Sequence, residues 1–221
     1  MDERVERARL LYERAVFDGD ATALDTADRE LDAAEADLAP ADLVPADLAL
    51  ARGRIAHGRF LAGEKEDPAE LALFERAARL YRALGDVRGE GESLFWIGVF
   101  HQVVRQDNGT AVPVLERSRE LAAQTGDKLT MSYVLRHLGI AEHIAGRLGP
   151  ARERLEESVH LRRELGFLPG VAANLIGLAY ITAAEGRRDE ALKVLDEAAE
   201  LAEATGAHGI LRSVKEAREA L

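Results

Sequence analysis

The sequence predicts an all-α protein built as a stacked array of helical hairpins, and three observations indicate this fold. Of its 221 residues, 47% are hydrophobic and only 5% aromatic, while Ala, Leu, Glu and Arg, which favour helices, are abundant. A block of eight residues recurs four times at steps of 41, 40 and 40 residues. A glycine follows every copy at the same distance. Self-similarity at such a period is typical of repeat proteins.

The recurring block predicts the end of the second helix, helix B, of each hairpin. Its copies begin at Leu73, Val114, Arg154 and Val194. The glycines that follow them are Gly85, Gly126, Gly166 and Gly206. Because glycine adopts the left-handed conformation that closes a helix, we expect each of them to end a helix B.

A second set of glycines predicts the turn inside each hairpin. These are Gly63, Gly109, Gly146 and Gly186. The preceding helix A carries a large-x-x-large-small signature, at 94–98, 135–139 and 175–179. Helix B carries Ala-x3-Leu-x2-Ser/Ala, at 111–118, 151–158 and 191–198. Small residues at these places should let the two helices of a hairpin approach closely.

Both ends of the chain depart from the repeat. Residues 2–17 and 21–38 predict an acidic hairpin with Leu24, Ala27 and Leu31 inward, followed by a connection over 39–45. Residues 208–220 predict a final helix with one apolar and one charged side, as the end of a repeat array requires. We therefore expect one domain over 1–221, with a degenerate hairpin in 1–40, regular hairpins in 41–206 and a capping helix in 207–221. About five hairpins precede the cap.

The regular part of the chain resembles the tetratricopeptide repeat (TPR) family, best at 151–166 and 174–180. It is most similar to the longer-repeat variety in bacterial signal-transduction ATPases and LuxR- or AfsR-like regulators. The resemblance covers residues 45–206. It implies a right-handed α-α superhelix. The step of about 40 residues exceeds the usual 34, and glycine replaces the proline that often ends helix B.

Composition narrows the possible functions. The chain has no cysteine, which excludes disulfides and thiolate metal sites. No stretch has the apolar length of a membrane span, and the N-terminus lacks a signal-peptide pattern, so we expect a cytoplasmic protein. Its net charge is −11, concentrated in residues 1–50, which disfavours nucleic acid as a ligand. The acidic segment is either a solvated end or a docking surface for a basic partner.

The TPR resemblance implies a concave groove lined by the A helices, and it places the candidate binding residues there. A peptide or protein segment is the implied ligand. The candidates are Arg54, His57, Phe95, Val99, Gln102, Val103, Tyr133, Arg136, Ile140, His143 and Tyr180.

Two features of these helices leave alternatives open. Residues 94–104 are apolar on nearly all sides, so some of them either face the groove or lie buried beneath the first hairpin. Arg136 suits a carboxylate or phosphate of a ligand, or it forms an ordinary ion pair with a neighbouring glutamate. Of the residues that hold carboxylates in peptide-binding TPR domains, only Asn174 has a candidate counterpart.

No pattern indicates catalysis, a cofactor or a metal site. His137 and His143 are six residues apart, a spacing at which one helix cannot aim both at one ion, and the sequence has no nucleophile elbow or phosphate-binding loop. We therefore predict a non-enzymatic binding scaffold or regulatory sensor. The alternatives are a self-assembling, homodimeric adaptor and a small-molecule sensor or enzyme with a closed apolar pocket near Trp96.

Overall fold

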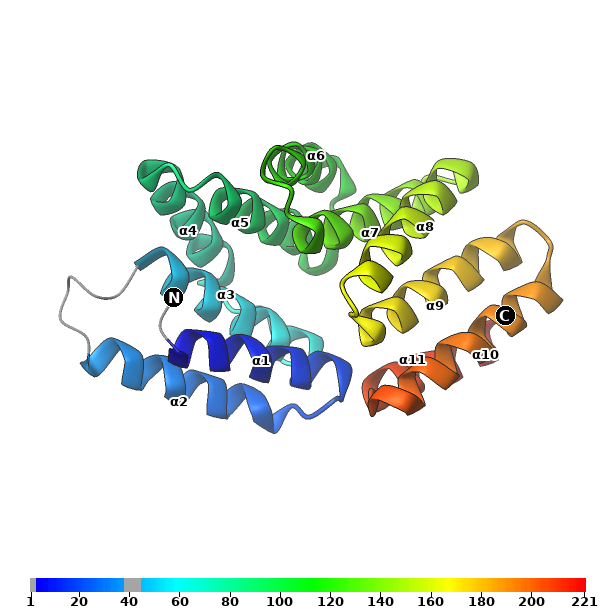
Figure 1. The fold of residues 1–221 in the computed structure, drawn as a ribbon, viewed down its shortest axis with the longest axis horizontal. Coiled ribbons are helices and arrows are strands. Elements are labelled where there is room, and N and C mark those ends of the chain that lie inside the picture. Colours follow the sequence, from blue (N-terminus) through cyan, green and yellow to red (C-terminus); the bar gives the residue numbers. More distant parts are fainter. Residues whose placement is uncertain (1–2, 38–44) are drawn as a thin grey trace. The chain divides into compact units, whose positions relative to one another are not determined.

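The computed structural model describes residues 3–37 and 45–221. Within them the chain is 85% helical, with eleven α-helices and one π-helix and without strands. Figure 1 shows the course of these helices along the chain. The expected all-α class is therefore confirmed. Residues 38–44 lie outside the described residues. They include the predicted end of the first hairpin and all but the last residue of the connection predicted over 39–45. No helix in the described ranges is both long and apolar enough to cross a membrane.

The chain divides into two compact units, Met1–Thr125 and Gly126–Leu221. The helices of the first unit are α1 (Glu3–Phe17), α2 (Thr22–Asp37), α3 (Pro45–Leu61), α4 (Glu70–Leu84), α5 (Val87–Val99), the π-helix η1 (Phe100–Val104) and α6 (Asn108–Thr125). Those of the second are α7 (Lys128–Ile144), α8 (Leu148–Glu164), α9 (Leu168–Ala184), α10 (Arg188–Thr205) and α11 (His208–Ala220).

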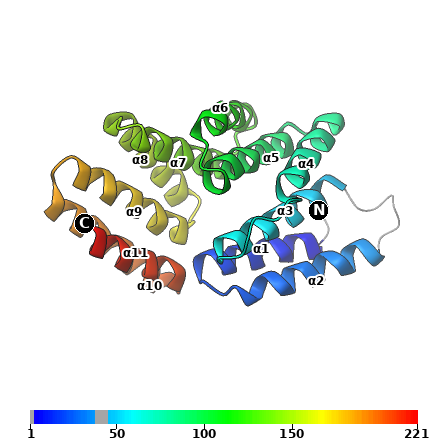
Figure 2. The same cartoon turned by 180° about the vertical axis from the view of Figure 1, so that it is seen from behind.

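Consecutive helices pack in pairs, as the hairpin pattern predicts. The pairs are α1 with α2, α3 with α4, α5 with α6, α7 with α8, and α9 with α10. Figure 1 shows α1 and α2 side by side, and likewise α9 and α10. Figure 2 shows the same pairs from behind. Within the first unit, Leu24, Ala27 and Leu31 of α2 are buried in a core shared with α1 and α3, so their predicted inward direction is confirmed.

Glycine ends the B helices where the sequence predicts it. Gly85, Gly126, Gly166 and Gly206 have φ angles of +71°, +67°, +69° and +70°. After α4 the N–H of Gly85 donates to the Arg82 carbonyl at 3.1 Å, and the N–H of Asp86 donates to the Tyr81 carbonyl at 2.9 Å. These bonds satisfy carbonyl groups that the end of the helix would otherwise leave unpaired.

The prediction for the turns inside the hairpins is right at three glycines and wrong at the fourth. Gly63, Gly146 and Gly186 have positive φ angles. Gly109 instead lies in the first turn of α6. Gln106, with φ +54°, takes the left-handed position of that hairpin. It lies 40 residues before Gly146, which lies 40 before Gly186.

The one longer step of the repeat coincides with the π-helix. Eight positions separate Gly98 from Gln106, whereas seven separate Gly139 from Gly146. The extra residue falls in the segment that contains η1. A π-helix bonds each N–H to the carbonyl five residues back and so takes up one residue more than an α-helical turn. The step of 41 residues is therefore accommodated inside helix A, and the hairpin turn keeps its form.

Small residues bring the two helices of a hairpin together, as expected. A Cβ atom on Gly98 would lie 2.6 Å from the Leu115 side chain, and one on Gly139 would lie 3.1 Å from that of Leu155. The hydroxyl of Ser118 donates to the Gly91 carbonyl at 2.6 Å, and that of Ser158 donates to the Ser132 carbonyl. The same packing and the same hydrogen bond therefore recur in two successive hairpins.

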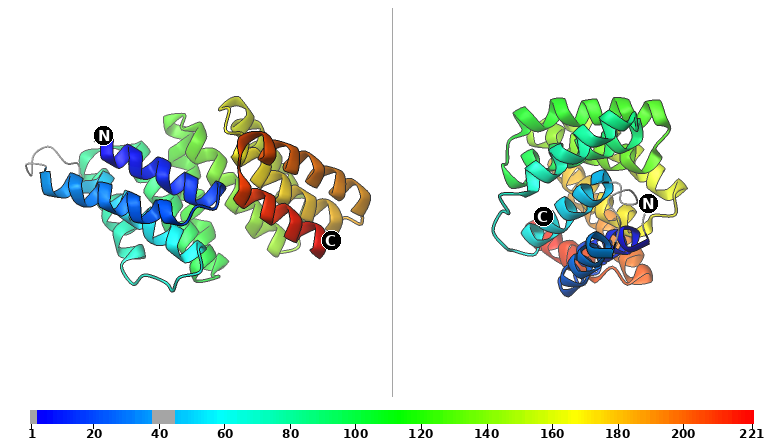
Figure 3. Two further views of the ribbon diagram at one scale, coloured as in Figure 1. Left: turned by 90° about the horizontal axis from the view of Figure 1, so that it is seen from below. Right: turned by 90° about the vertical axis from the view of Figure 1, so that its left-hand side faces the viewer.

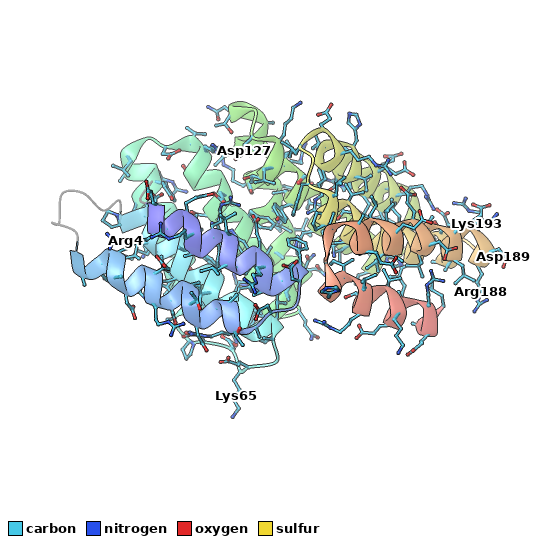
Figure 4. All side chains as sticks on the ribbon, turned by 60° about the horizontal axis from the view of Figure 1, so that its bottom comes forward. Arg4, Lys65, Asp127, Arg188, Asp189 and Lys193 are labelled. Atoms are coloured by element: carbon cyan, nitrogen blue, oxygen red, sulfur yellow. The ribbon has the colours of Figure 1, made fainter. Side chains whose placement is uncertain are left out.

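The last helix has the two faces that the sequence predicts. Ile210, Val214 and Ala217 of α11 are buried, and Leu211 is half-buried, while the charged residues on its other side are exposed. Figure 3 shows α11 lying along α10. Arg188 Nε donates to the carbonyl of Leu221 at 2.7 Å. Figure 4 shows Arg188 at the start of α10, while Lys65 projects away from the α3–α4 turn.

Candidate functional site

The predicted binding residues divide between the two units. In the first unit Arg54 and His57 lie on α3, Phe95 and Val99 on α5, and Gln102 and Val103 in η1. In the second unit Tyr133, Arg136, Ile140 and His143 lie on α7 and Tyr180 on α9.

Trp96 is the centre of an aromatic cluster in the first unit. The rings of Tyr12, His57, Phe74 and Phe95 have their centroids 5.1–5.6 Å from its ring. Trp96 itself is 8% exposed, and Phe95, Val99 and Phe100 are also buried, while Val103 is half-buried. Because Tyr12 comes from α1, the first hairpin contributes to covering α5. This arrangement favours the interpretation that the apolar helix is buried beneath the first hairpin.

His57 forms a buried polar pair with Glu70, a residue that the sequence did not single out. His57 Nδ1 lies 2.8 Å from Glu70 Oε1, and both side chains are buried. Within the described residues, Glu70 Oε2 and Trp96 Nε1 have no hydrogen-bond partner. A buried polar pair between α3 and α4 holds those helices in one register, because either group alone would be costly to bury.

Arg54 and Gln102 also have partners within the first unit. Arg54 forms an ion pair with Glu92 of α5, and its guanidinium carbon lies 5.6 Å from the centroid of the Trp96 ring. Its charge also acts on Glu13, whose pKa is nevertheless raised because burial outweighs the attraction of Arg9 and Arg54. Gln102 Nε2 donates to Asn108 Oδ1 at 2.9 Å. The positive charge of Arg54 is therefore opposed by acidic groups of its own unit.

The predicted residues of the second unit are more accessible. All five, on α7 and α9, are half-buried. Tyr133, Arg136, Ile140 and His143 follow one another at i, i+3, i+7 and i+10, a spacing that forms one stripe along a helix. We call these four residues and Tyr180 the α7–α9 face. It combines apolar, aromatic and basic side chains.

Arg136 connects α7 to α9. Its Nη1 donates to the Ala173 carbonyl at 2.9 Å and to Asn174 Oδ1 at 3.0 Å. Both acceptors are neutral oxygens, and no ion pair of Arg136 occurs among the described residues. Arg136 therefore does not form the ordinary ion pair with a neighbouring glutamate that the sequence left open as an alternative.

A second arginine, Arg162 of α8, reaches the same amide oxygen, although the helical pattern of the sequence does not single it out. It is 1% exposed. Its Nη1 donates to the Gly170 carbonyl at 2.7 Å and to Asn174 Oδ1 at 3.1 Å. Its guanidinium carbon lies 4.7 Å from the Tyr133 ring centroid and 5.4 Å from that of Phe167.

The repeat contains a signal that could have revealed this residue. The equivalent places in the other B helices hold Tyr81, Ala122 and Ala202, and all of them are buried. An arginine at a position that is uncharged in every other copy predicts a buried charge. We call Arg136, Arg162 and Asn174 the arginine–asparagine cluster.

Asn174 is oriented so that its oxygen faces the two arginines. Its Nδ2 donates to Ser158 Oγ at 2.7 Å, and Ser158 in turn donates to the Ser132 carbonyl. A flipped amide would place N–H groups against two cationic donors, so the hydrogen-bond network fixes this orientation. Burial lowers the pKa of Arg162 to about 9, so the side chain is still protonated at pH 7. Burial also lowers the pKa of Arg136.

No family model matches the chain, and no curated protein matches it. In the described ranges, no three His, Asp or Glu side chains are grouped so that they could hold a metal ion. The α7–α9 face with the arginine–asparagine cluster is the strongest candidate for a binding site, because it joins partly exposed side chains to a positive charge that no acid of the described residues neutralises.

Proposed function

We propose that the protein is a non-catalytic scaffold or regulatory sensor that binds a peptide or protein segment on the A-type helices of a TPR-like array. One observation carries this proposal. The α7–α9 face presents half-buried apolar and aromatic side chains beside Arg136, whose charge is not paired with a carboxylate in the described residues. Such a mixed surface suits a segment with apolar anchors and an acidic group.

The helical arrangement supports the TPR part of the proposal. Five successive helix pairs, left-handed glycines at the ends of B helices and the recurrent Gly98–Leu115 and Gly139–Leu155 packing fit a repeat array. In such an array each hairpin is a scaffold unit, and the residues that differ between copies carry specificity.

Binding would use a surface that is already formed. Helix residues fixed by packing lose little freedom when a ligand binds, so less of the interaction energy is spent on ordering the site. Ile140 would act as the apolar anchor, because it lies in the middle of the stripe on α7 and is half-buried. Burying such a side chain in a complex contributes about 1.5–3 kcal/mol.

The test is selection of ligands from a displayed library of random peptides with the full chain as bait. We expect wild type to enrich peptides that carry an acidic residue close to apolar ones. Ile140→Asp should weaken their binding by about tenfold or more, because it removes an anchor and places a carboxylate beside Arg136. The matched control is Leu165→Asp, an equally polar change at an exposed residue that follows α8.

The proposal fails if wild type enriches no peptide, or if Ile140→Asp and Leu165→Asp bind the selected peptides equally well while both remain helical by circular dichroism. Retained folding is required for the comparison. Ile140 is only half-buried, so its replacement should leave the core of the second unit in place.

A further inference from the structure

The arginine–asparagine cluster places two guanidinium groups against one neutral oxygen. Arg136 and Arg162 reach Asn174 Oδ1 from α7 and α8, at 3.0 Å and 3.1 Å. Both side chains carry a positive charge, and their other hydrogen-bond acceptors among the described residues are a hydroxyl oxygen and backbone carbonyl oxygens. Like charges that converge in this way repel one another, and the repulsion is strong where water is excluded.

Charge balance is what the cluster lacks. Arg54 in the first unit has Glu92, and Arg152 in the second unit has Glu185 at 2.6 Å. For Arg136 and Arg162, no acidic side chain of the described residues lies within ion-pair distance. Buried charges in proteins are normally paired or bound to an ion, so this exception is informative.

Arg162 also has donor capacity that the described residues leave unused. Its Nη2 is buried and has no hydrogen-bond partner among them. Stacking near Tyr133 and Phe167 offsets part of the cost of burying the charge through cation–π attraction. That attraction does not supply an acceptor for the N–H groups of Nη2, and such groups are costly when buried.

Arg136 gives the cluster access to solvent. It is half-buried, as is Tyr133 one turn earlier on α7. Asn174 and Ala173 accept from Nη1 only, so the remaining edge of the guanidinium group can donate to a ligand. A ligand oxyanion would therefore contact Arg136 directly, while Arg162 would stabilise it from the interior by its charge.

We propose that Arg136 and Arg162 form an oxyanion-binding site whose ligand is a carboxylate group. A planar carboxylate matches the free edge of a planar guanidinium group, with two parallel N–H···O bonds. The aromatic rings of Tyr133 and Phe167 beside the cluster suit the apolar part of an organic acid better than a fully hydrated anion. The inference that this carboxylate belongs to a peptide rests on the proposed peptide-binding function. The inference of an oxyanion-binding site does not.

The experiment titrates the full chain, labelled with nitrogen-15, with sodium acetate, sodium phosphate and sodium chloride at equal ionic strength. The arginine Nε–H resonances report binding, and those of Arg136 and Arg162 are assigned from the variants. We expect acetate to shift these two resonances saturably and chloride to leave them unchanged. Arg136→Met should weaken acetate binding by about tenfold or more.

Three variants separate binding from folding. Arg136→Lys keeps the charge but loses the planar fork, so it should recover only part of the affinity. Arg162→Met should weaken acetate binding while Arg136 stays in place. Arg212→Met removes an exposed positive charge of α11 and should bind acetate as wild type does. If Arg162→Met does not fold, Arg136→Met and Arg136→Lys still decide the matter, because Arg136 is only half-buried.

Three outcomes would overturn the inference. Equal shifts with acetate and chloride, or equal acetate binding by Arg136→Met and Arg212→Met, would remove the oxyanion site. Saturable binding of phosphate without binding of acetate would remove the assignment to a carboxylate. Acetate binding by a chain that enriches no library peptide would leave the site in place and reject the proposed peptide-binding function, so the two failures are distinguishable.

Discussion

The backbone N–H of Arg105 donates to the carbonyl oxygen of Phe100, five residues earlier, at 3.2 Å. This bond belongs to η1, the place where the repeat contains its one extra residue. If the extra residue is simply absorbed there, removing it should restore the geometry of the neighbouring hairpin. Deletion of His101 aligns Phe100 with Ala141 and Gln102 with Glu142.

We therefore expect the chain without His101 to fold and to lose less than about 1–2 kcal/mol of unfolding free energy. The matched control is deletion of Glu142 on α7, at the corresponding place in a helix without a π-helix. That deletion should lower the unfolding free energy more, because the corresponding turn of α7 contains no extra residue. Urea denaturation followed by circular dichroism measures both. Equal losses in the two deletions would contradict the role assigned to η1.

The left-handed conformation of Gln106 is less favourable than the same conformation would be for glycine. Its φ angle is +54°, where Gly146 and Gly186 occupy the equivalent turns. A residue with a Cβ atom loses roughly 1 kcal/mol in this conformation relative to glycine. Gln106→Gly should therefore raise the unfolding free energy by about 0.5–1 kcal/mol, and the reciprocal Gly146→Gln should lower it by about 1 kcal/mol. Thermal or urea unfolding of both variants checks the pair, and a loss of stability in Gln106→Gly would refute it.

Three glycine-to-alanine variants should rank by the space at each site. Gly98→Ala places a methyl group 2.6 Å from Leu115, and Gly139→Ala places one 3.1 Å from Leu155, whereas Gly149 has no neighbour within 4 Å. Overpacking should cost Gly98→Ala about 1–3 kcal/mol. Gly139→Ala should change stability by less than about 1 kcal/mol, and Gly149→Ala should gain about 0.5 kcal/mol from helix propensity. Any other order in urea denaturation would show that hairpin contacts do not set the cost.

The His57–Glu70 pair should behave as a unit. Removing only the imidazole, as in His57→Ala, leaves the buried Glu70 carboxyl group without its partner and should cost about 3–5 kcal/mol. The double variant His57→Leu with Glu70→Leu removes both polar groups and should lie within about 1–2 kcal/mol of wild type. Trp96 is the only tryptophan and contacts the His57 ring, so its fluorescence follows unfolding of the first unit. A double variant as unstable as His57→Ala, or more so, would argue against this coupling.

The sequence predicts most of the helices because their ends depend on local chemistry. Gly85, Gly126, Gly166 and Gly206 close helices since glycine alone adopts positive φ without strain. Gln106 departs from this rule, because the hairpin turn places a residue in the left-handed conformation there and the sequence has no glycine at that position. A period that changes from 40 to 41 residues is visible in the sequence, but the place where the extra residue is absorbed is not.

The candidate site was less predictable because it depends on contacts between distant residues. Tyr12 packs on Trp96 across 84 positions, a contact that no helical periodicity contains. Arg162 looks like any charged residue of an exposed helix until it is compared with Tyr81, Ala122 and Ala202 of the other B helices. Comparison of the copies indicates a buried arginine. The contact of Arg162 and Arg136 with the same Asn174 oxygen, however, depends on how α7, α8 and α9 pack together.

Glu185 should make the second unit sensitive to acid. It accepts hydrogen bonds from Arg152 of α8 and from Arg187, and these bonds lower its pKa from the ordinary 4.5 to about 2. A carboxyl group with a lowered folded-state pKa stabilises the folded protein above its unfolded-state pKa, and this contribution is lost as the pH falls through the folded-state pKa. The Arg152 and Glu185 side chains are 24% and 23% exposed, so solvent screening keeps the contribution to about 1 kcal/mol.

Glu185→Gln should therefore be less stable than wild type by about 1 kcal/mol at pH 6, and the difference should shrink as the pH is lowered from 4.5 toward 2. Urea midpoints measured at several pH values in this window give the difference. Glu197→Gln, which breaks an ion pair with Arg163 that is about half exposed, should show little difference at any pH. A Glu185→Gln difference that stays constant from pH 6 to pH 3 would mean that the carboxylate charge of Glu185 does not hold α8 to the end of α9.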